Sequence, residues 1–397
     1  MGGKQSLKIS LIPGRRAVKD LLRGFFIRRL NRFTVICSLK GRAVRAYLPN
    51  PGRLWEILLP GRRLFLSRQK GAGKLPYVVV AAEVEGYPVL LHTQLANSYA
   101  EELIAEKLIP GLEEYSISQR EFRTGASRID FLLEGKEKKM ALEVKTSTLS
   151  CGQLALFPDA VTARGRKHLE ELAHLAKNKG WAAGILFIVW TPKARYFLPD
   201  FHTDWEFSAA LLRSRHDLFI QALVPSLEND LSLKMEPARP LQIPWQLVAL
   251  ENKNRGAYLV ILRTKSKFSL SVGRLGEMPF SSGYYVYVGS AQDHLEARLE
   301  RHRRKRKRFF WHIDYLRAKT DWVAGLPLRS SEDIECDLTR GLTNFSRPIS
   351  GFGCSDCQCS SHLFYFLQNP LQYPPFIHLL HRFRYQSLER KIIPFAP

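Results

Sequence analysis

Residues 128–147 read Arg-Ile-Asp-Phe-Leu-Leu-Glu-Gly-Lys-Glu-Lys-Lys-Met-Ala-Leu-Glu-Val-Lys-Thr-Ser, and this stretch indicates the fold of the first half of the chain. Two apolar runs flank Gly135 and the charged residues 136–139, a pattern typical of two strands joined by a tight turn. Side chains alternate along a strand, so Glu143 and Lys145 are expected to project from the same face. Asp130 lies on the preceding strand. Two carboxylates and one amine should therefore converge.

This arrangement is typical of a metal-dependent phosphodiesterase site. Asp130 and Glu143 are hard oxygen ligands suited to Mg²⁺ or Mn²⁺. Lys145 could orient a water molecule or neutralise negative charge in the transition state. Glu101 or Glu102, on a helix predicted over residues 97–108, could also reach the metal, although most helix glutamates face water. The alternative for the hairpin is an ordinary half-buried strand, which also alternates apolar and charged residues.

Composition narrows the class of protein. The chain has 397 residues and a formal charge of +23, so we expect two or three domains and contact with a polyanion, most simply a nucleic-acid backbone. A charged surface that only keeps the protein dissolved is the alternative. No apolar stretch approaches the roughly 20 residues that span a bilayer, so no membrane partner is expected. Six cysteines are too few for a disulfide scaffold, which favours a reducing cytoplasm.

The first 93 residues show short strand patterns separated by Gly and Pro turns. The predicted strands cover Phe33–Leu39, Ala43–Leu48, Leu64–Ser67, Tyr77–Val84 and Pro88–His92. Five such strands suit a small barrel of the OB type, a fold that commonly holds single-stranded nucleic acid. Arg53 follows a strong turn signal and stands near Trp55, so the pair could present a cation and a stacking surface. A core Trp beside a solvated Arg is an equal alternative.

Residues 94–235 are predicted to form a second domain, because a helix, the hairpin, a basic helix after Pro158 and a strand at 185–189 follow in the order of an α/β nuclease core. Prolines 237, 240 and 244 then predict a linker over residues 236–250. Apolar strand patterns return at 256–262 and 283–289, so a further domain is expected over residues 251–397.

Phenols, a guanidinium and an imidazole mark a candidate site in this last domain. Tyr258 and Tyr287 lie on its two predicted strands, and a helix beginning near residue 293 places Arg298 and His302 one turn apart on one face. A tyrosine oxygen could act in the attack on a phosphodiester, Arg298 could clamp the phosphate, and Glu335 could hold one metal ion. An aromatic core beside a solvated basic helix is the alternative.

A basic run at residues 301–308 is followed by Phe309, Phe310 and Trp311. Such a block of like charge repels itself unless it meets a polyanion, and the aromatic rings could stack on bases or pack into the core. The candidate nucleic-acid contacts in this run are Arg301, Arg303, Arg304, Lys305 and Arg306.

Cys354, Cys357, Cys359 and His362 crowd one short segment and are ligand types that zinc accepts. Because structural zinc sites usually combine ligands from two separated knuckles, zinc is the minority interpretation here. The alternative is a loop of small packed thiols, with His362 available to an active site or a phosphate.

Four longer motifs give the first half of the chain a resemblance to a known family. These are residues 49–54 (Pro-Asn-Pro-Gly-Arg-Leu), 127–132, 143–149 and 157–172. Over roughly residues 10–235 the chain resembles the SfsA family, named for sugar fermentation stimulation. The resemblance implies an OB-like domain and a PD-(D/E)XK nuclease-like domain that binds DNA. It carries the acidic pair and lysine onto Asp130, Glu143 and Lys145, and a DNA-binding basic helix onto Arg164, Arg166, Lys167 and His168.

The last domain resembles a Uri-type GIY-YIG endonuclease over roughly residues 250–367. The similarity lies in Gly256-Ala257-Tyr258, Tyr287-Val288-Gly289-Ser290, Arg298, His302, residues 311–316 and Glu335. The chain departs from that pattern in Ala257, in Val288 and in a long insert between the two triplets.

Together these patterns predict a multidomain α/β protein: an OB-like barrel, a PD-(D/E)XK nuclease-like core and a GIY-YIG-like domain. The expected activity is Mg²⁺-dependent or Mn²⁺-dependent hydrolysis of DNA. A non-catalytic DNA-binding regulator and an RNA-processing protein are the alternatives, with DNA favoured over RNA. The sequence does not indicate an oligomeric state.

Overall fold

The computed structural model describes residues 8–9, 21–69, 75–125, 127–178, 180–228, 231–355 and 357–392. The chain divides into two compact units, residues 1–200 with 206–245 and residues 201–205 with 246–397. Within the described part of the chain, no helix has both the length and the apolar character that crossing a bilayer requires.

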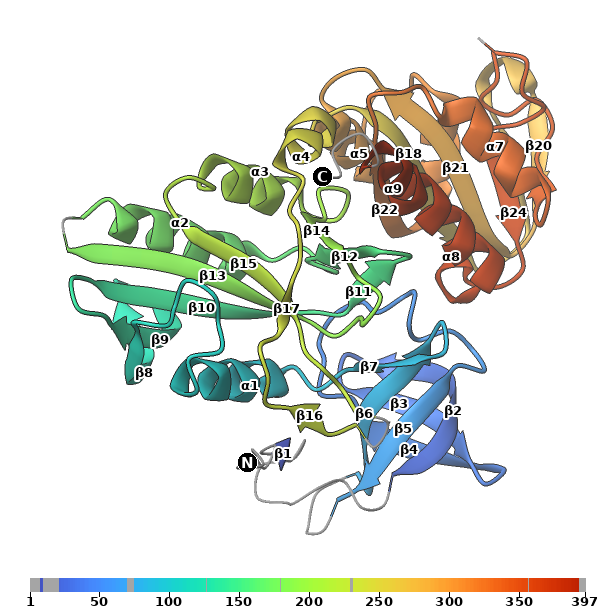
Figure 1. The fold of residues 1–397 in the computed structure, drawn as a ribbon. Coiled ribbons are helices and arrows are strands. Elements are labelled where there is room, and N and C mark those ends of the chain that lie inside the picture. Colours follow the sequence, from blue (N-terminus) through green and yellow to red (C-terminus); the bar gives the residue numbers. More distant parts are fainter. Residues whose placement is uncertain are drawn as a thin grey trace. The chain divides into compact units, whose positions relative to one another are not determined.

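A closed barrel begins the first unit (Figure 1). Its strands are β2 (Leu22–Asn31), β3 (Thr34–Leu39), β4 (Arg42–Tyr47), β5 (Arg63–Arg68) and β6 (Tyr77–Val84). They follow the order β4-β3-β2-β5-β6, and a parallel pairing of β4 with β6 closes the ring, while β7 (Tyr87–Leu90) continues beside β6. The OB-like barrel expected from the sequence is confirmed. Strand β2 was not predicted, because its outward positions carry Phe25 and Ile27 and hide the apolar alternation.

A six-stranded mixed sheet forms the rest of the first unit, in the order β17-β15-β13-β10-β9-β8. Its strands are β8 (Ser116–Thr124), β9 (Ser127–Glu134), β10 (Lys139–Ser147), β13 (Trp181–Val189), β15 (Phe219–Val224) and β17 (Arg239–Pro240). Strands β10, β13 and β15 are parallel, and the others join antiparallel. Helices α1 (Gln94–Ala105) and α2 (Ala163–Ala176) pack against this sheet, and α3 (Trp205–Arg213) lies between β13 and β15 in the chain.

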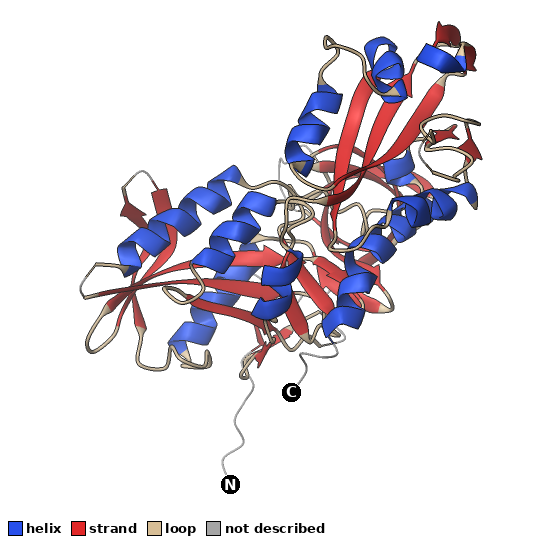
Figure 2. Cartoon of the chain, turned by 90° about the horizontal axis from the view of Figure 1, so that it is seen from above, coloured by secondary structure: helices blue, strands red, loops and turns tan. Residues whose placement is uncertain are grey.

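Smaller strands complete this unit. A three-stranded sheet contains β11 (Leu149–Cys151), β12 (Leu154–Phe157) and β14 (Tyr196–Pro199), and β1 (Lys8–Ile9) pairs with β16 (Leu233–Lys234). The cartoon in Figure 2 shows the long strands running beside helices. The α, β-hairpin, α, β order expected from the sequence is present.

Two apolar cores cover the two faces of the sheet. Along β13, Ile185 and Phe187 belong to the core that contains Leu169 and Leu172 of α2, whereas Leu186 and Ile188 belong to the other core. Both faces of β13 are therefore buried, which explains why its sequence is a continuous apolar run. Strands β10 and β13 are buried along most of their length. The second core also contains the interior of the barrel, so one body of apolar side chains joins barrel and sheet.

The second unit is built on a five-stranded antiparallel sheet in the order β22-β18-β21-β24-β23. Its strands are β18 (Gly256–Thr264), β21 (Gly283–Ala291), β22 (Asp321–Arg329), β23 (Arg347–Pro348) and β24 (Leu363–Phe366). The helices are α4 (Trp245–Glu251), α5 (Leu295–Arg303), α6 (His312–Lys319), α7 (Glu335–Thr343), α8 (Pro374–His381) and α9 (Ser387–Ile392). A hairpin of β19 (Phe268–Ser271) and β20 (Glu277–Phe280) forms the long insert noted between the two triplets.

The segment 236–250, expected as a linker, contains regular structure. Strand β17 pairs with β15 at the edge of the sheet, where Pro240 is tolerated because an edge strand does not need every N–H for the ladder. Helix α4 begins at Trp245, directly after Pro244. Strand β8 was also missed, because its pattern is mostly polar and exposed.

Candidate functional site

The two strands of the central hairpin separate at the predicted acidic pair. The β9–β10 ladder extends from Glu134 and Lys139 to Phe131 and Leu142, and stops before Asp130 and Glu143. There the Val144 N–H donates to Asp130 Oδ2 at 2.8 Å, and the Asp130 N–H donates to Glu143 Oε2 at 3.3 Å. The carboxylates thus replace the missing ladder bonds, and the structure brings them together as the sequence predicted.

Three further side chains orient this pair. Asn97 on α1 donates through Nδ2 to Asp130 Oδ1 at 2.7 Å. Lys145 Nζ lies 2.5 Å from Glu143 Oε1, and His168 Nδ1 on α2 lies 2.8 Å from the same oxygen. Arg164 Nε donates to His168 Nε2 at 3.3 Å, which assigns the ring hydrogen to Nδ1. Neither Asn97 nor this role of His168 was predicted.

The two carboxylates have different proton affinities. Burial, together with the neighbouring Glu143 charge, raises the pKa of Asp130 to about 6. Burial also acts to raise the pKa of Glu143, but the hydrogen bonds and charges of His168 and Lys145 outweigh it, and that pKa is lowered. The repulsion between the buried Glu143 carboxylate and the half-buried Asp130 carboxylate would be relieved by a cation. Two hard oxygen donors fit Mg²⁺, Mn²⁺ or Ca²⁺, with water and phosphate oxygens completing the coordination.

The predicted nucleic-acid contacts on α2 differ in exposure and in their partners. Arg164 and Lys167 are exposed on α2, and Lys167 Nζ lies 3.9 Å from a Glu171 carboxylate oxygen. Arg166 forms an ion pair with Glu206. His168 was expected to bind nucleic acid from the surface, but it is buried against Glu143 because its helix packs on the sheet.

The glutamates of α1 do not join the acidic pair. Glu101 forms an ion pair with Arg120 on β8, and the α1 side chain that contacts Asp130 is Asn97. Asn97 and Glu101 are four residues apart and share a face of the helix. Asn97 lies one helical turn closer to Asp130 than Glu101 does.

The turn at residues 49–54 contacts the segment around Asp159. The Asn50 Oδ1 accepts from the Gly52 N–H at 2.9 Å, and a Cβ built on Gly52 would lie 2.0 Å from Asp159 Oδ2. The position therefore needs glycine because the carboxylate packs directly on the backbone. The Arg53 guanidinium carbon lies 4.9 Å from the centre of the Trp55 ring, so the expected cation and aromatic pair does form.

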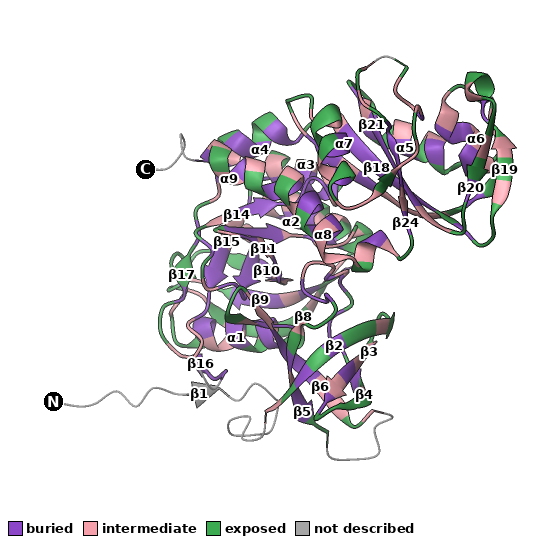
Figure 3. Cartoon of the chain, turned by 90° about the vertical axis from the view of Figure 1, so that its right-hand side faces the viewer, coloured by how far each residue is buried: buried purple, intermediate pink, exposed green. Residues whose placement is uncertain are grey.

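A surface of the barrel combines apolar and basic side chains. Paired residues of antiparallel strands project to the same side, and the register places Arg28, Ile36 and Arg45 in one row across β2, β3 and β4. Phe25 and Tyr47 are exposed on the same strands, and Phe33 stacks on Tyr47 with ring centres 6.3 Å apart. Figure 3 shows β2 coloured largely as exposed.

Four of the candidate residues in the second unit line a common cavity of about 380 Å³: Tyr258, Tyr287, Arg298 and Glu335. The fifth, His302, is buried behind them, with Nε2 2.9 Å from the Tyr258 hydroxyl oxygen. Burial raises the pKa of the Tyr258 phenol, so this group stays protonated. A Cβ on Gly289 would lie 2.4 Å from that hydroxyl, which explains the glycine of the second triplet.

Arg301 has a different place from the one expected. Its guanidinium donates to both carboxylate oxygens of the buried Asp314, at 3.1 and 2.9 Å. It also lies over the Trp311 ring, 4.2 Å from the centre, and Arg298 lies 4.5 Å from the same centre. Arg301 thus holds α5 and α6 together, because an unpaired Asp314 could not remain buried. We correct its assignment as a phosphate contact.

The remainder of the basic run is exposed. Arg303, Arg304, Lys305 and Arg306 all lie at the surface, and Lys305 Nζ lies 3.9 Å from a carboxylate oxygen of Asp321. Phe310 has 79% of its surface exposed and lines the cavity that contains Tyr258 and Arg298. Of the three aromatic residues after the run, Phe310 and Trp311 both line this cavity, and Phe310 is the more exposed of the two.

A thiol cluster lies close to Glu335. Ligand atoms of Cys336, Cys357, Cys359 and His362 are all within 4.8 Å of one another, whereas Cys354 is not in this group. Hydrogen bonds from Glu335 and Cys359 raise the pKa of His362 to about 9, although burial alone would lower it. The sequence proposed Cys354 from its spacing, but Cys336 on α7 occupies that place.

Comparison with known proteins follows these divisions of the chain. Residues 27–91 match the family described as SfsA N-terminal OB domain, and residues 94–224 match the sugar fermentation stimulation protein RE domain. Residues 257–384 match a domain of unknown function, DUF123.

Similar proteins cover the first unit. The sugar fermentation stimulation protein homolog of Methanothermobacter thermautotrophicus is 37% identical over 231 residues, which are 57% of this chain and 95% of that protein. The homolog from Pyrobaculum arsenaticum is 41% identical over 194 residues, 49% of this chain and 82% of that one. The solved structure of Pyrococcus furiosus SfsA in complex with Ca²⁺ is 32% identical, covers 57% of this chain and 97% of that chain, and superposes with a TM-score of 0.53.

The fold is therefore that of a multidomain α/β protein, in which an OB-like barrel is joined to a nuclease-like core and a further α/β domain follows. The chain belongs to the sugar fermentation stimulation protein family, to which it adds a DUF123 domain.

Proposed function

We propose that this protein binds DNA and hydrolyses its phosphodiester bonds with a divalent cation held by Asp130 and Glu143. The observation that carries the proposal is the close approach of the half-buried Asp130 carboxylate to the buried Glu143 carboxylate at the opening of the β9–β10 hairpin, with the Lys145 ammonium 2.5 Å from Glu143. The Pyrococcus furiosus relative was solved with Ca²⁺, a hard cation of the kind that carboxylates bind. This supports a cation-binding role for the family.

The residues around the pair have separable tasks in this proposal. Asn97 and the Val144 N–H hold the Asp130 carboxylate in place, and His168 holds that of Glu143. Lys145 orients the attacking water and balances negative charge that develops on the phosphate. A bound divalent ion would supply Lewis-acid polarisation of a phosphate oxygen.

The barrel supports binding of a nucleic acid strand. Exposed Phe25, Phe33 and Tyr47 offer stacking surfaces, and Arg28 and Arg45 stand between them. Stacking tolerates any base, so this surface by itself favours neither DNA nor RNA. Binding without cleavage is therefore the second candidate function, and the barrel surface is the observation in its favour.

A second hydrolytic site is proposed in the GIY-YIG-like unit. Its support is the shared cavity of Tyr258, Tyr287, Arg298 and Glu335. Arg298 is the residue suited to the phosphate, and Tyr258 is fixed by its hydrogen bond to His302. Glu335 would hold a divalent cation here.

A single cleavage experiment tests both sites. Plasmid and single-stranded oligonucleotide are incubated with the full chain in Mg²⁺ or Mn²⁺, with EDTA as the metal-free reference. We expect Asp130→Asn and Glu143→Gln to slow cleavage at least about 100-fold, because the metal contribution amounts to several kcal/mol. Glu335→Gln and Tyr287→Phe are measured in the Asp130→Asn background to isolate the second site.

Matched controls are Glu134→Gln on β9 and Asp337→Asn on α7, both exposed and both on the same elements as the tested residues. Cleavage at the normal rate by the Asp130→Asn, Glu335→Gln double variant would reject both sites. DNA binding by the wild-type protein with no cleavage in any metal would leave only the second candidate function.

A further inference from the structure

We infer that Cys336, Cys357, Cys359 and His362 form a zinc site, which fixes the wall of the cavity in the second unit. The four ligand atoms lie within 4.8 Å of one another, and three thiolates with one imidazole are a donor set typical of structural zinc. Ligands at about 2.3 Å from a tetrahedral ion lie about 3.8 Å apart, so small side-chain movements would complete the shell.

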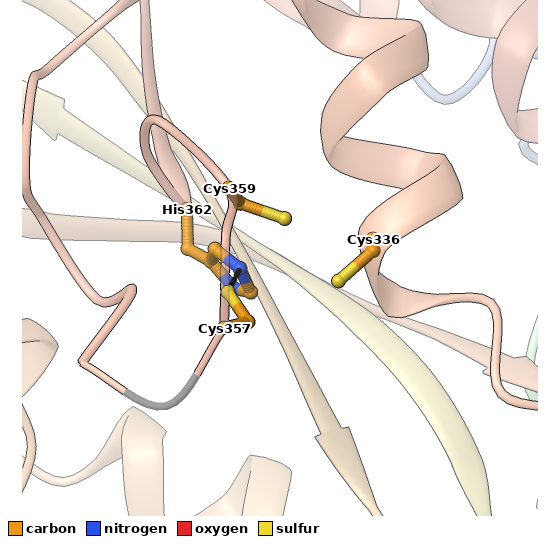
Figure 4. Close-up of side chains that lie close together, drawn as sticks. All are labelled: Cys336, Cys357, Cys359 and His362. Atoms are coloured by element: carbon orange, nitrogen blue, oxygen red, sulfur yellow. Dashed lines mark hydrogen bonds between the residues drawn. The ribbon is translucent and has the colours of Figure 1, made fainter.

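The ligands come from two separate elements. Structural zinc sites usually combine ligands from two separate segments in this way. Cys336 lies in the first turn of α7, whereas Cys357 and Cys359 belong to the loop that leads into β24. Figure 4 shows the Cys336 side chain pointing from the helix toward the loop, and that of Cys359 pointing back toward the helix. The sequence interval between Cys336 and Cys357 hides this pairing, because the two elements meet only in the folded unit.

His362 is held in the orientation that a ligand requires. Its backbone carbonyl accepts from the Val288 N–H at 2.9 Å, and its N–H donates to Phe352 at 2.7 Å, so the main chain is anchored to the sheet. Its Nδ1 lies 2.9 Å from Glu335 Oε1, and its Nε2 lies 3.2 Å from Cys357 Sγ. A carboxylate on one ring nitrogen directs the other nitrogen to the metal, as in carboxylate–histidine–zinc arrangements.

The zinc site would act on the cavity through two connections. Glu335, which lines the cavity, is hydrogen-bonded to His362 and precedes Cys336 in the chain. Gly353 and Ser355 line the same cavity and belong to the loop that carries Cys357. Zinc would therefore fix α7 against this loop and hold the Glu335 carboxylate at a defined place. Thr339 Oγ1, 3.3 Å from Cys359 Sγ, adds a hydrogen bond to a thiolate.

The test is metal analysis of the full-length protein purified with a thiol reductant. We expect one zinc per chain, and we expect Co²⁺ taken up in its place to give the visible bands of a tetrahedral thiolate complex. Cys336→Ser should lose the metal. Cys354→Ser is the matched control, since this cysteine is in the same loop but outside the cluster, and it should retain one zinc per chain.

Glu335→Gln gives an independent readout, because it leaves all four ligands in place. We expect it to keep one zinc per chain while weakening zinc affinity roughly 10-fold to 100-fold in competition with a chelator. Absence of zinc and of cobalt uptake in the reduced protein would overturn the inference, as would full zinc retention by Cys336→Ser. A disulfide within the cluster under these conditions would also overturn it. None of these results depends on whether the protein cleaves DNA.

Discussion

Single contacts link the barrel to the nuclease-like core at the residue scale. Arg29 on β2 donates to the carbonyl oxygens of Gly52 and Arg53, at 2.6 and 2.9 Å, and so holds the turn that follows Pro49. The Asp159 carboxylate packs on the backbone of this turn at Gly52. The motifs at residues 49–54 and 157–172, far apart in the sequence, are therefore two sides of one junction.

Gly52→Ala tests this junction. The new methyl group would overlap Asp159 Oδ2, 2.0 Å away, and should lower the free energy of unfolding by about 1 to 3 kcal/mol. Chemical denaturation of the wild-type protein, the two single variants and the double variant with Asp159→Ala gives the coupling energy. Most of the cost of Gly52→Ala should disappear when Asp159 is alanine. An equal cost in both backgrounds would contradict the proposed overlap.

The acidic pair was accessible from the sequence because a hairpin is local. Asp130, Glu143 and Lys145 are close in the chain, and strand alternation alone fixes their faces. Asn97 and His168 come from helices on either side of the hairpin, so their approach depends on how those helices pack. No local signal distinguishes Asn97 from the glutamates that follow it on α1.

The same limit applies at the cysteine cluster. Spacing in the sequence favoured Cys354, but Cys336 enters through the docking of α7, which only tertiary packing determines. Arg301 was grouped with its neighbours by charge alone, and its partner Asp314 lies on the next helix. Charge patterning thus identifies a basic run, but it does not separate structural from available cations.

At the element scale, the connection between α5 and α6 carries a group of exposed basic side chains. The exposed residues Arg304, Lys305 and Arg306 should contribute counterion release on DNA binding. Replacing all three by alanine should lower affinity and reduce the slope of log Kd against log salt by up to roughly 0.9 for each lost phosphate contact. Fluorescence anisotropy over a salt series measures both quantities.

The control for that series removes the same number of charges elsewhere. Lys136, Lys138 and Lys139 at the tip of the β9–β10 hairpin are also exposed, and their triple alanine variant should have a smaller effect on the slope. Equal slopes for the wild-type protein and the Arg304, Lys305, Arg306 variant would show that this connection does not contact phosphate.

The β9–β10 hairpin also shows how a regular strand pattern can end at a residue whose side chain replaces a ladder hydrogen bond. Ile129 belongs to the core that contains α2, whereas Phe131 belongs to the core shared with the barrel. Residues two apart in a regular strand would face one core, so β9 changes its orientation at Asp130. The strand prediction succeeded for the extent of the hairpin and could not show this local departure.

At the scale of the whole first unit, one buried carboxylate should make stability depend on pH. Burial and the nearby charges of Asp159 and Asp200 raise the pKa of Glu56 from 4.5 to about 8, and its Oε1 has no hydrogen-bond partner among the described residues. The folded state therefore binds this proton more tightly than the unfolded state does. Its contribution to stability is complete below about pH 4.5 and is lost as pH rises toward 8.

Glu56→Gln keeps the shape of the side chain and removes the titration. Relative to the wild-type protein, the variant should gain roughly 1 to 3 kcal/mol in free energy of unfolding between about pH 5 and about pH 9. Denaturant titrations at several pH values measure this difference, with the exposed Glu85→Gln as a control that should show no such trend. A pH profile of Glu56→Gln parallel to that of the wild-type protein would contradict the assignment.

Leu95, Tyr99 and Leu103 of α1 sit in the same apolar mass as Val35 and Leu64 of the barrel. A truncated protein that ends at residue 93 would lack α1, and the apolar side chains that α1 covers would be exposed to water. The barrel is thus a poor choice for separate expression or for grafting onto another enzyme. A nucleic acid bound on the outer face of the barrel would therefore rest on a part of the chain that is packed firmly against the rest of the first unit.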